Sequence, residues 1–304
     1  MCQEFMASRK EIEQIYDVFS KLLRLSLGEH FDFTCAFYNG DYSKTLEQAQ
    51  KDKHEYILEN IKFRKGMRVL DIGSGWGPML KVIGEKGGKA VGITLSSDQV
   101  EVCKRHGLEA YLKDWKEMKA GEFGKFDGII SVGAFEHFSS PKEYLEGRQD
   151  DVYKQFFKLC HDTLPQGGRL YLQTSVWGEN APRYEDVSLK APKNSNEYLL
   201  ALLEKFFPGS YPPFGEKQVL ENAIGFKTIS VNTSTLDYIH TIKEWRKYGR
   251  KINFAKIVAV VKLLPHYITD KNFRYQIECF GRNVFTTMYK REVMHLTRIV
   301  FEKV

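Results

Sequence analysis

Short apolar runs alternate with helix-length segments along the middle of the chain, from residue 67 to about residue 177. The longer segments carry apolar residues at helical spacing. One begins at Ser96 with Gln99 three residues later, a capping-box pattern, and another runs from Pro141 to near Leu164. The apolar runs, which we predict to be strands, are RVLDI, KAVGITL, LEAYLKD, FDGIISV and GGRLYLQTSV. Strands that alternate with helices predict an α/β fold with a parallel, doubly wound sheet.

The flanking parts of the chain extend this core. Two further strand-like runs predict an antiparallel edge, so the expected sheet is seven-stranded, mostly parallel and Rossmann-like. Ligands of such sheets bind beyond the carboxyl ends of the strands, where we expect a helical cap. The expected parts of a single domain over 1–304 are a helical N-terminal lid (1–60), a ligand-binding core (61–177), the helical cap (178–222 and 236–290) and the final strands (226–233 and 293–303).

Composition and charge narrow the class of protein. The 304 residues are 42% hydrophobic and 28% charged, which is ordinary for a globular chain. The net charge of +6 permits contact with anionic substrates or a membrane surface, although a solvated basic face also explains it. The N-terminus lacks the apolar core of a secretory signal. The most apolar late stretch, INFAKIVAVVKLLPHYI, is interrupted by Lys256 and Lys262 and is too short to span a bilayer.

Cysteine usage points to a reducing environment. The five cysteines are odd in number, widely spread and without a Cys-x-x-Cys pair. This pattern argues against a disulfide framework and against a zinc site. We therefore expect a cytoplasmic protein that holds no metal.

A glycine-rich turn follows the first predicted strand, in RVLDIGSGWG. Glycine at Gly73 and Gly75 lets the backbone approach a ligand closely, because no Cβ stands in the way. A dinucleotide fingerprint would need a glycine where Pro78 stands, and an acid at the end of the second strand, which reads GITL instead. A nicotinamide cofactor is therefore disfavoured. A purely structural turn explains one glycine more readily than three beside Asp71.

Several motifs together resemble a specific family. Residues 71–77, DIGSGWG, look like the first motif of class I S-adenosylmethionine-dependent methyltransferases. More narrowly, nearly the whole chain resembles the cyclopropane fatty acid synthase and mycolic acid cyclopropane synthase family. The segments that carry this narrower resemblance are FTCAFY (33–38), TLEQAQ (45–50), GITLS (92–96) with Gln99, GAFEHF (133–138), FPG (207–209), and Tyr238 with Thr241 and Trp245. The resemblance implies a methyltransferase domain that uses S-adenosylmethionine.

The resemblance also implies which residues hold this cofactor. Beside Asp71, the two glycines would pack against the methionine portion, and Thr34 would close over its carboxylate. An amide both donates and accepts, so Gln99 can serve the ribose diol in place of the usual acid. Asp114 would accept from the adenine amino group. The implied cofactor-binding residues are Thr34, Asp71, Gly73, Gly75, Thr94, Leu95, Gln99, Asp114 and Trp115, although Trp115 alternatively serves core packing.

Catalysis is expected around Glu136, which follows the fourth strand. A carboxylate there can stabilise positive charge near the reacting centre, whereas His137 would point away and brace the backbone if the segment stays extended. Ring closure to a cyclopropane needs a base, and in the resembled family this is a bound bicarbonate. Its implied surroundings are Glu136, Cys35 (mainly through its backbone), Tyr238 and Gln173. Gln173 stands where the family has histidine, and glutamine donates a hydrogen bond but carries no proton.

The substrate is left open by the sequence. Aromatic residues crowd the predicted cap, which suits either an acyl-chain tunnel or an ordinary core. The leading hypothesis is the double bond of an unsaturated fatty acyl chain, by cyclopropanation or by methyl or methylene branching; the alternative is N- or C-methylation of a small amine, a prenyl compound or another natural-product precursor. The amphipathic segment 254–264 is expected to pack in the core, or alternatively to touch a membrane surface or an acyl carrier protein.

Two rivals come from other classes of protein. Base-amino methylation of nucleic acid usually needs an Asn- or Asp-Pro-Pro-aromatic motif after the fourth strand, where this chain has SVGAF, so no nucleic-acid partner is expected. A non-catalytic protein that only binds the cofactor would not need Glu136 or Tyr238 for any turnover.

Overall fold

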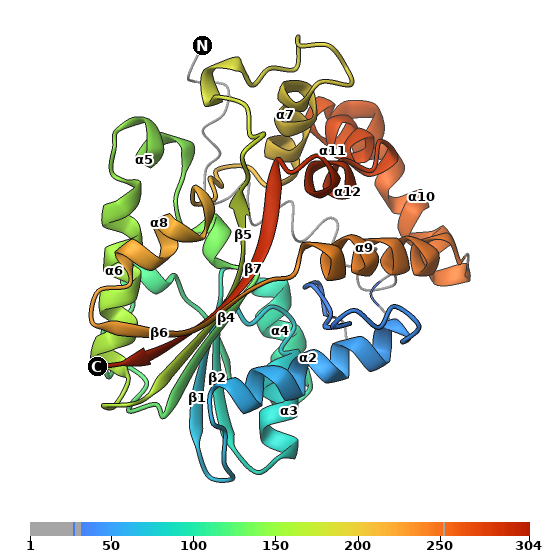
Figure 1. Ribbon diagram of the computed structural model, residues 1–304. Helices are drawn as coiled ribbons and strands as arrows, with labels where there is room; N and C mark the ends of the chain where they lie inside the picture. The colour runs from blue at the N-terminus through green and yellow to red at the C-terminus, as the bar shows by residue number, and fades with distance from the viewer. Residues whose placement is uncertain (1–26, 28–31, 252) are drawn as a thin grey trace.

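Seven strands form one sheet in the computed structural model, which describes residue 27, residues 32–251 and residues 253–304 (Figure 1). The strand order is β3-β2-β1-β4-β5-β7-β6. The strands are β1 (Arg68–Ile72), β2 (Lys89–Thr94), β3 (Ala110–Leu112), β4 (Gly128–Val132), β5 (Arg169–Trp177), β6 (Phe226–Thr233) and β7 (Met294–Lys303). The predicted seven-stranded, mostly parallel α/β sheet is confirmed.

The last two strands form the predicted antiparallel edge. β1 to β5 are parallel, and β7 runs antiparallel to β5 and to β6. β6 therefore runs in the same direction as the parallel strands, and β7 alone is reversed. The two strands are not joined by a hairpin, because four helices separate them in the sequence. The chain thus crosses the cap before β7 inserts between β5 and β6.

Helices cover both faces of the sheet (Figure 1). On one face Ile57 and Ile83 pack with Val69 of β1, and on the other Phe156 packs with Leu70 and its neighbours, because successive strand residues point to opposite faces. The helices of the first face are α2 (Leu46–Asn60), α3 (Pro78–Glu85) and α4 (Ser97–Arg105); those of the second are α5 (Pro141–Leu145), α6 (Gln149–Thr163) and α8 (Gly215–Asn222).

The predicted N-terminal lid is only partly described. Residues 1–26 and 28–31 lie outside the described residues, and residues 32–44 contain no helix. α2 begins after Thr45, whose side chain accepts from the backbone N–H of Gln48, while the Gln48 side chain accepts from the backbone N–H of Thr45. This reciprocal capping box explains why TLEQAQ starts a helix at this point.

The cap is built from helices that pack mainly on one another. They are α7 (Asn196–Phe206), α9 (Thr235–Arg250), α10 (Phe254–Thr269), α11 (Lys271–Gly281) and α12 (Val284–Lys290). α8 belongs to the segment assigned to the cap, but it packs on α6 and β5, because Val219 faces the core beneath the sheet. No single helix in the described part of the chain is long and apolar enough to cross a membrane. α9 and α10 meet that test only as a pair, with a bend of 93° between them.

Candidate active site

One large cavity lies beyond the carboxyl ends of the parallel strands and extends into the cap. Its volume is about 1420 Å³, more than the several hundred cubic ångströms of a typical small-molecule site. Every site residue predicted from the sequence lines it: Thr34, Cys35, Asp71, Gly73, Gly75, Thr94, Leu95, Gln99, Asp114, Trp115, Glu136, Gln173 and Tyr238. The cavity therefore has room for a nucleoside cofactor and a second ligand side by side.

The glycine turn after β1 is fixed by close packing. Gly73 has φ +88°, and a Cβ built there would lie 2.3 Å from the Cβ of Ala134 after β4, so only glycine fits. Gly75 has φ +56° and faces open space, because no heavy atom lies within 4 Å of a built Cβ. The turn thus brings bare backbone to the cavity wall at the start of α3, as a ligand in close contact requires.

The segment after β2 offers an amide and a hydroxyl to the cavity. The predicted capping box is only half formed: the backbone N–H of Gln99 donates to Ser96 Oγ, but the Gln99 side chain turns elsewhere. Its Oε1 accepts a 2.5 Å hydrogen bond from Thr94 Oγ1. Since Gln99 Oε1 already accepts from Thr94, the Nε2 group of Gln99 is the part of the amide that can donate to a ligand.

Asp114 and Trp115 follow β3. The sequence allows a cofactor-binding role for both residues and, for Trp115, core packing instead. Asp114 Oδ1 accepts from the backbone N–H of Lys116 and so caps a short 3₁₀ turn. Trp115 is 6% exposed and its ring packs against Phe138 and Phe156, so core packing accounts for most of the indole. Both residues nevertheless line the cavity.

A buried charged cluster that the sequence analysis missed lies beside the glycine turn. Asp32 Oδ2 is 2.5 Å from Lys53 Nζ and 2.9 Å from His54 Nε2, and Lys53 also donates to Thr34 Oγ1. Burial alone would raise the pKa of Asp32, but Lys53 and His54 hold it well below its usual value. Burial, with Asp32 nearby, raises the pKa of Asp71 to about 8. Burial lowers the pKa of Lys53, and the paired Asp32 opposes this shift, so Lys53 lies on the cavity wall as one half of a buried pair.

Glu136 lies in a 3₁₀ turn after β4 and faces strand β5. Thr174 Oγ1 donates to its Oε2 at 3.0 Å, and Ser175 Oγ donates to its Oε1 at 3.3 Å. Ser175 Oγ also lies 2.6 Å from the hydroxyl of Tyr289 in α12. Burial raises the pKa of Glu136 to about 7 even though these hydroxyls favour its charged form. Strand β5, supported by α12 of the cap, therefore orients one carboxyl group at the cavity wall.

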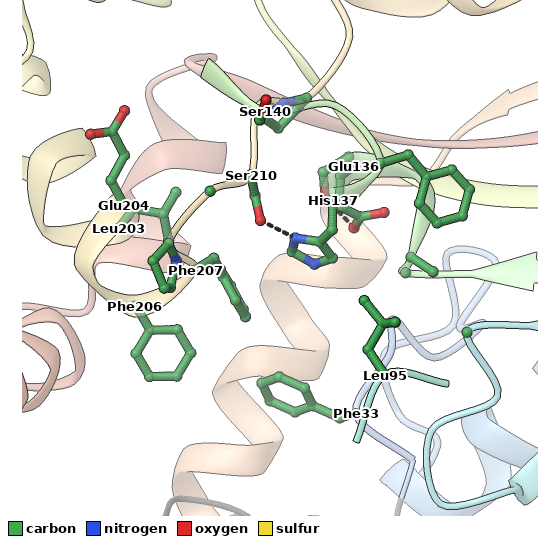
Figure 2. A pocket seen from close by; sticks show the side chains of 18 of the residues that line it. Phe33, Leu95, Glu136, His137, Ser140, Leu203, Glu204, Phe206, Phe207 and Ser210 are labelled. Atoms are coloured by element: carbon green, nitrogen blue, oxygen red, sulfur yellow. Dashed lines mark hydrogen bonds between the residues drawn. The ribbon is translucent and has the colours of Figure 1, made fainter. Parts of the chain in front are cut away.

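His137 also faces the cavity, which corrects the prediction that it points away. Its Nδ1 lies 2.8 Å from Ser210 Oγ in the loop after α7, and its ring lies 5.0 Å from that of Phe207 (Figure 2). In a 3₁₀ turn the side chains of successive residues are rotated by about 120° around the turn axis, whereas in a strand they point to opposite faces. Neighbouring side chains such as those of Glu136 and His137 can therefore both face the cavity. Burial lowers the pKa of His137 to about 4, which keeps the imidazole neutral at pH 7.

Comparison with known proteins identifies the family. Residues 3–278 match the Mycolic acid cyclopropane synthetase family. The chain belongs to this family. It is an S-adenosylmethionine-dependent methyltransferase, as the motifs predicted.

Individual relatives agree with this assignment. The chain is 29% identical over 246 residues to cyclopropane mycolic acid synthase 2 of Mycobacterium leprae, covering 77% of each protein. It is 29% identical over 294 residues to the S-adenosylmethionine-dependent methyltransferase UmaA of Mycobacterium tuberculosis, covering 91% of this chain and 97% of UmaA. The crystal structure of mycolic acid cyclopropane synthase CmaA1 complexed with SAH and CTAB has the same fold, with a TM-score of 0.72 at 23% identity over 99% of this chain and 100% of that one.

In this methyltransferase Gln173 is held by a buried arginine. Arg298 of β7 is 1% exposed and stands opposite Gln173 in the register of β5 and β7. Its Nε donates to Gln173 Oε1 at 2.9 Å. Because a guanidinium only donates, the glutamine must present its oxygen to Arg298, and its amide nitrogen remains for the cavity side. The lone arginine in the apolar run HLTRIVF was a signal that the sequence analysis did not use.

The same arginine fixes the segment that carries Cys35. Arg298 Nη2 donates to Ala36 O at 2.9 Å and to Cys35 Sγ at 3.4 Å, and Nη1 contacts Asp237 Oδ2 at 3.3 Å. Burial raises the pKa of the Cys35 thiol to about 12, so it stays protonated. From α9, Thr241 Oγ1 accepts from the backbone N–H of Ala36. The cysteine thus contributes shape and backbone to the cavity rather than a reactive thiolate.

Tyr238 completes the constellation from the cap. It lies on the first turns of α9, and its ring is 4.9 Å from that of Tyr289. The structure therefore brings Tyr238, Gln173, Cys35 and Glu136 to one cavity from α9, β5, the N-terminal segment and the turn after β4. Within the described residues, no group of three or more histidine, cysteine, aspartate or glutamate side chains is placed to hold a metal ion.

Proposed function

We propose that this methyltransferase transfers the methyl group of S-adenosylmethionine to the double bond of an unsaturated fatty acyl chain. The observation that supports this proposal is the continuity of the cavity. It runs from the glycine turn past Glu136 into an apolar compartment of the cap, and the side chains that line that compartment include Phe33, Leu203, Phe206, Phe207, Phe285 and Leu296. Figure 2 draws this compartment, with Phe33, Phe206 and Phe207 around the space in front of Glu136 and His137.

The cofactor would lie at the polar end of the cavity. Gly73 and Gly75 would contact its methionine portion, and Asp71 would lie beside them. Thr34 and the ammonium of Lys53 would face the carboxylate. The ribose would lie between Thr94, Leu95 and Gln99, whose free amide group donates to a hydroxyl. Adenine would occupy the space beside Asp114 and Trp115.

The proposed reaction is a direct displacement at the methyl carbon. The π electron pair of the acceptor forms the new carbon–carbon bond. The carbon–sulfur bond breaks at the same time, and the electron pair of that bond stays on sulfur. Positive charge then moves to the second alkene carbon. The ionised carboxylate of Glu136, held in place by Thr174 and Ser175, stabilises this charge electrostatically. Loss of a proton from the new methyl closes a cyclopropane, whereas loss from another carbon leaves a branch.

A bicarbonate ion as the proton acceptor remains a proposal. The donors present suit a small anion: the Gln173 amide nitrogen, which Arg298 leaves unused, the backbone around Cys35, and the hydroxyl of Tyr238. When bound, bicarbonate would supply a base beside the acceptor. Glutamine in place of the family histidine holds the ion without adding a charge to a wall that already contains Arg298.

Isotope labelling tests the proposed acceptor. We expect protein incubated with methyl-labelled S-adenosylmethionine and extracts of lipids and small metabolites to place label in the acyl fraction. The products are separated by solvent partition and chromatography, and boiled protein is the control. Label found only in water-soluble amines would contradict the acyl proposal.

Bicarbonate dependence tests the second step. With an acyl acceptor in degassed buffer, added bicarbonate is expected to raise the cyclopropane yield severalfold in the parent protein and much less in Gln173→Leu, which cannot donate. Gas chromatography of the methyl esters separates ring from branch. An equal yield with and without bicarbonate would remove the ion from the mechanism.

A second candidate function, methylation of an amine, is favoured by one observation in the cap. Glu204 of α7 lines the cavity, and its Oε2 is buried with no hydrogen-bond partner among the residues that the structure describes. Burial raises its pKa to about 8. A substrate ammonium group would stabilise the ionised form of this carboxyl and return its pKa toward the usual range. The labelling experiment decides between the two candidates.

A further inference from the structure

Helix α10 presents an apolar face to the outside of the molecule. Phe254 is 81% exposed, Ile257 50%, Val261 57%, Leu264 50% and Ile268 73%. These positions follow one another at intervals of three and four residues, so they form a single stripe along the whole helix. Figure 1 shows α10 at the periphery of the cap, next to α9 and α11. Scattered apolar residues are normal on a surface, but an unbroken stripe of this length is a feature of binding surfaces.

The opposite side of α10 is anchored, so the stripe is held facing outward. Lys256 and Ala259 are buried there. Lys256 Nζ donates to the carbonyl oxygens of Tyr248, Gly249 and Lys251, at and just past the end of α9, where carbonyls lack partners within the helix. Its ammonium group therefore ties the start of α10 to the preceding helix across the bend.

Positive charge surrounds the stripe. Residues 246–274 contain eight lysines and arginines and a single acid, Asp270, whereas the whole chain has a net charge of only +6. The side chain of Asp270 is engaged as the N-cap of α11. Exposed cations stand on α10 and at both of its ends: Arg250, Lys251, Lys262 and Lys271. Apolar residues on one face with cations at the margins are typical of helices that lie in a bilayer interface.

We propose that the apolar face of α10 docks on the surface of an anionic lipid bilayer, with the helix lying in the plane of the interface. Negative lipid headgroups match the surrounding cations, and each basic residue near such a surface adds to binding. A second copy of this chain would instead bring two sets of these cations together. The biological purpose of this docking rests on the proposed acyl-chain function, because acyl chains are held in membranes. The binding to the bilayer itself needs no turnover.

Vesicle flotation tests this docking. The full chain is mixed with vesicles of phosphatidylcholine alone, or of phosphatidylcholine with phosphatidylglycerol, and the floated fraction is measured. We expect the anionic vesicles to bind the parent protein at least tenfold more tightly than neutral ones, and 0.5 M salt to weaken this binding. The double variant Val261→Glu/Leu264→Glu is expected to lose at least tenfold in partitioning.

Ile224→Glu is the matched control. Ile224 is also an exposed aliphatic residue, at 66%, but it lies before β6, far along the chain from α10. It should float as the parent does, and all three proteins should show the same melting temperature. Equal flotation of parent and double variant would overturn the proposal. A parent protein that binds no vesicles would also overturn it. This outcome includes a parent that sediments as a dimer which the double variant dissociates, and a parent that binds only an acidic carrier protein.

A solution assay separates this inference from the proposed function. With an acyl acceptor dispersed in detergent, the double variant should methylate at the parent rate, because neither substituted residue lines the cavity. Vesicle binding without any acyl product would leave the docking surface intact and refute the acyl acceptor. Acyl product without vesicle binding would refute the docking alone.

Discussion

Glu136→Gln lowers kcat at least about 100-fold and leaves the dissociation constant of S-adenosylhomocysteine within about twofold of the parent value. The substitution keeps the size but removes the negative charge. The glutamine oxygen can accept from one of the two hydroxyls of Thr174 and Ser175, and its amide nitrogen can donate to the other. Removing one preorganised electrostatic group from an active site commonly costs about 100- to 1000-fold in rate. Single-turnover kinetics measure the rate, and calorimetry measures the binding.

The pH profile gives the same prediction a second readout. Since the pKa of Glu136 is raised to about 7, its carboxylate is protonated below that pH, and the rate should fall there and rise to a plateau above it. The rise should be absent from the residual activity of Glu136→Gln. Glu101→Gln, which changes an exposed acid on α4, is the control and should behave as the parent. If Glu136→Gln turned over at nearly the parent rate, the prediction would be wrong, and the carboxyl group of Glu136 would have only a structural role.

Arg298→Met is expected to reduce the free energy of unfolding by about 3–5 kcal/mol, the usual cost of removing one partner from a buried ion pair. The change leaves Asp237 without the buried guanidinium, and it removes the donor to Gln173 Oε1 and to Ala36 O. Methionine fills much of the volume but donates nothing. Urea denaturation at pH 7, followed by circular dichroism, measures the difference.

Arg169→Met is the matched control for this loss. Arg169 lies on β5 and its Nε donates to Glu302 at 2.9 Å, but the two side chains are 14% and 25% exposed. A partly exposed pair contributes about 1 kcal/mol or less. Equal losses in the two variants would contradict the view that burial makes Arg298 special. A loss of cofactor binding in Arg298→Met without any loss of stability would also contradict it.

The cavity wall gives Gln173 a fixed orientation. The guanidinium of Arg298 needs an acceptor from β5, and the glutamine oxygen supplies one at every pH. An imidazole could accept only while neutral, and its protonated form would face a second cation. The orientation of Gln173 is thus coupled to the strand register, which pairs position 173 with position 298.

Local patterns predicted the elements that depend on neighbouring residues. RVLDI alternates between the two sheet faces, and the glycine after it is required by a left-handed φ and by the Cβ of Ala134. The helix begins after Thr45 because Thr45 and Gln48, within its own first turn, satisfy each other's backbone N–H groups. In contrast, the half-formed cap at Ser96 could not be foreseen, because Gln99 bonds to Thr94 on the preceding strand instead.

By itself the sequence determined the doubly wound sheet, the glycine turn and the family of this methyltransferase, because strand alternation, helix caps and glycine spacing act over a few residues. Only the tertiary structure decided the direction of β6, the inward side of His137, the Asp32–Lys53 pair and the hold of Arg298 on Gln173, 125 residues away in the chain. These features arise where distant segments meet, and their energies depend on burial and partner geometry, which the order of residues along the chain does not express.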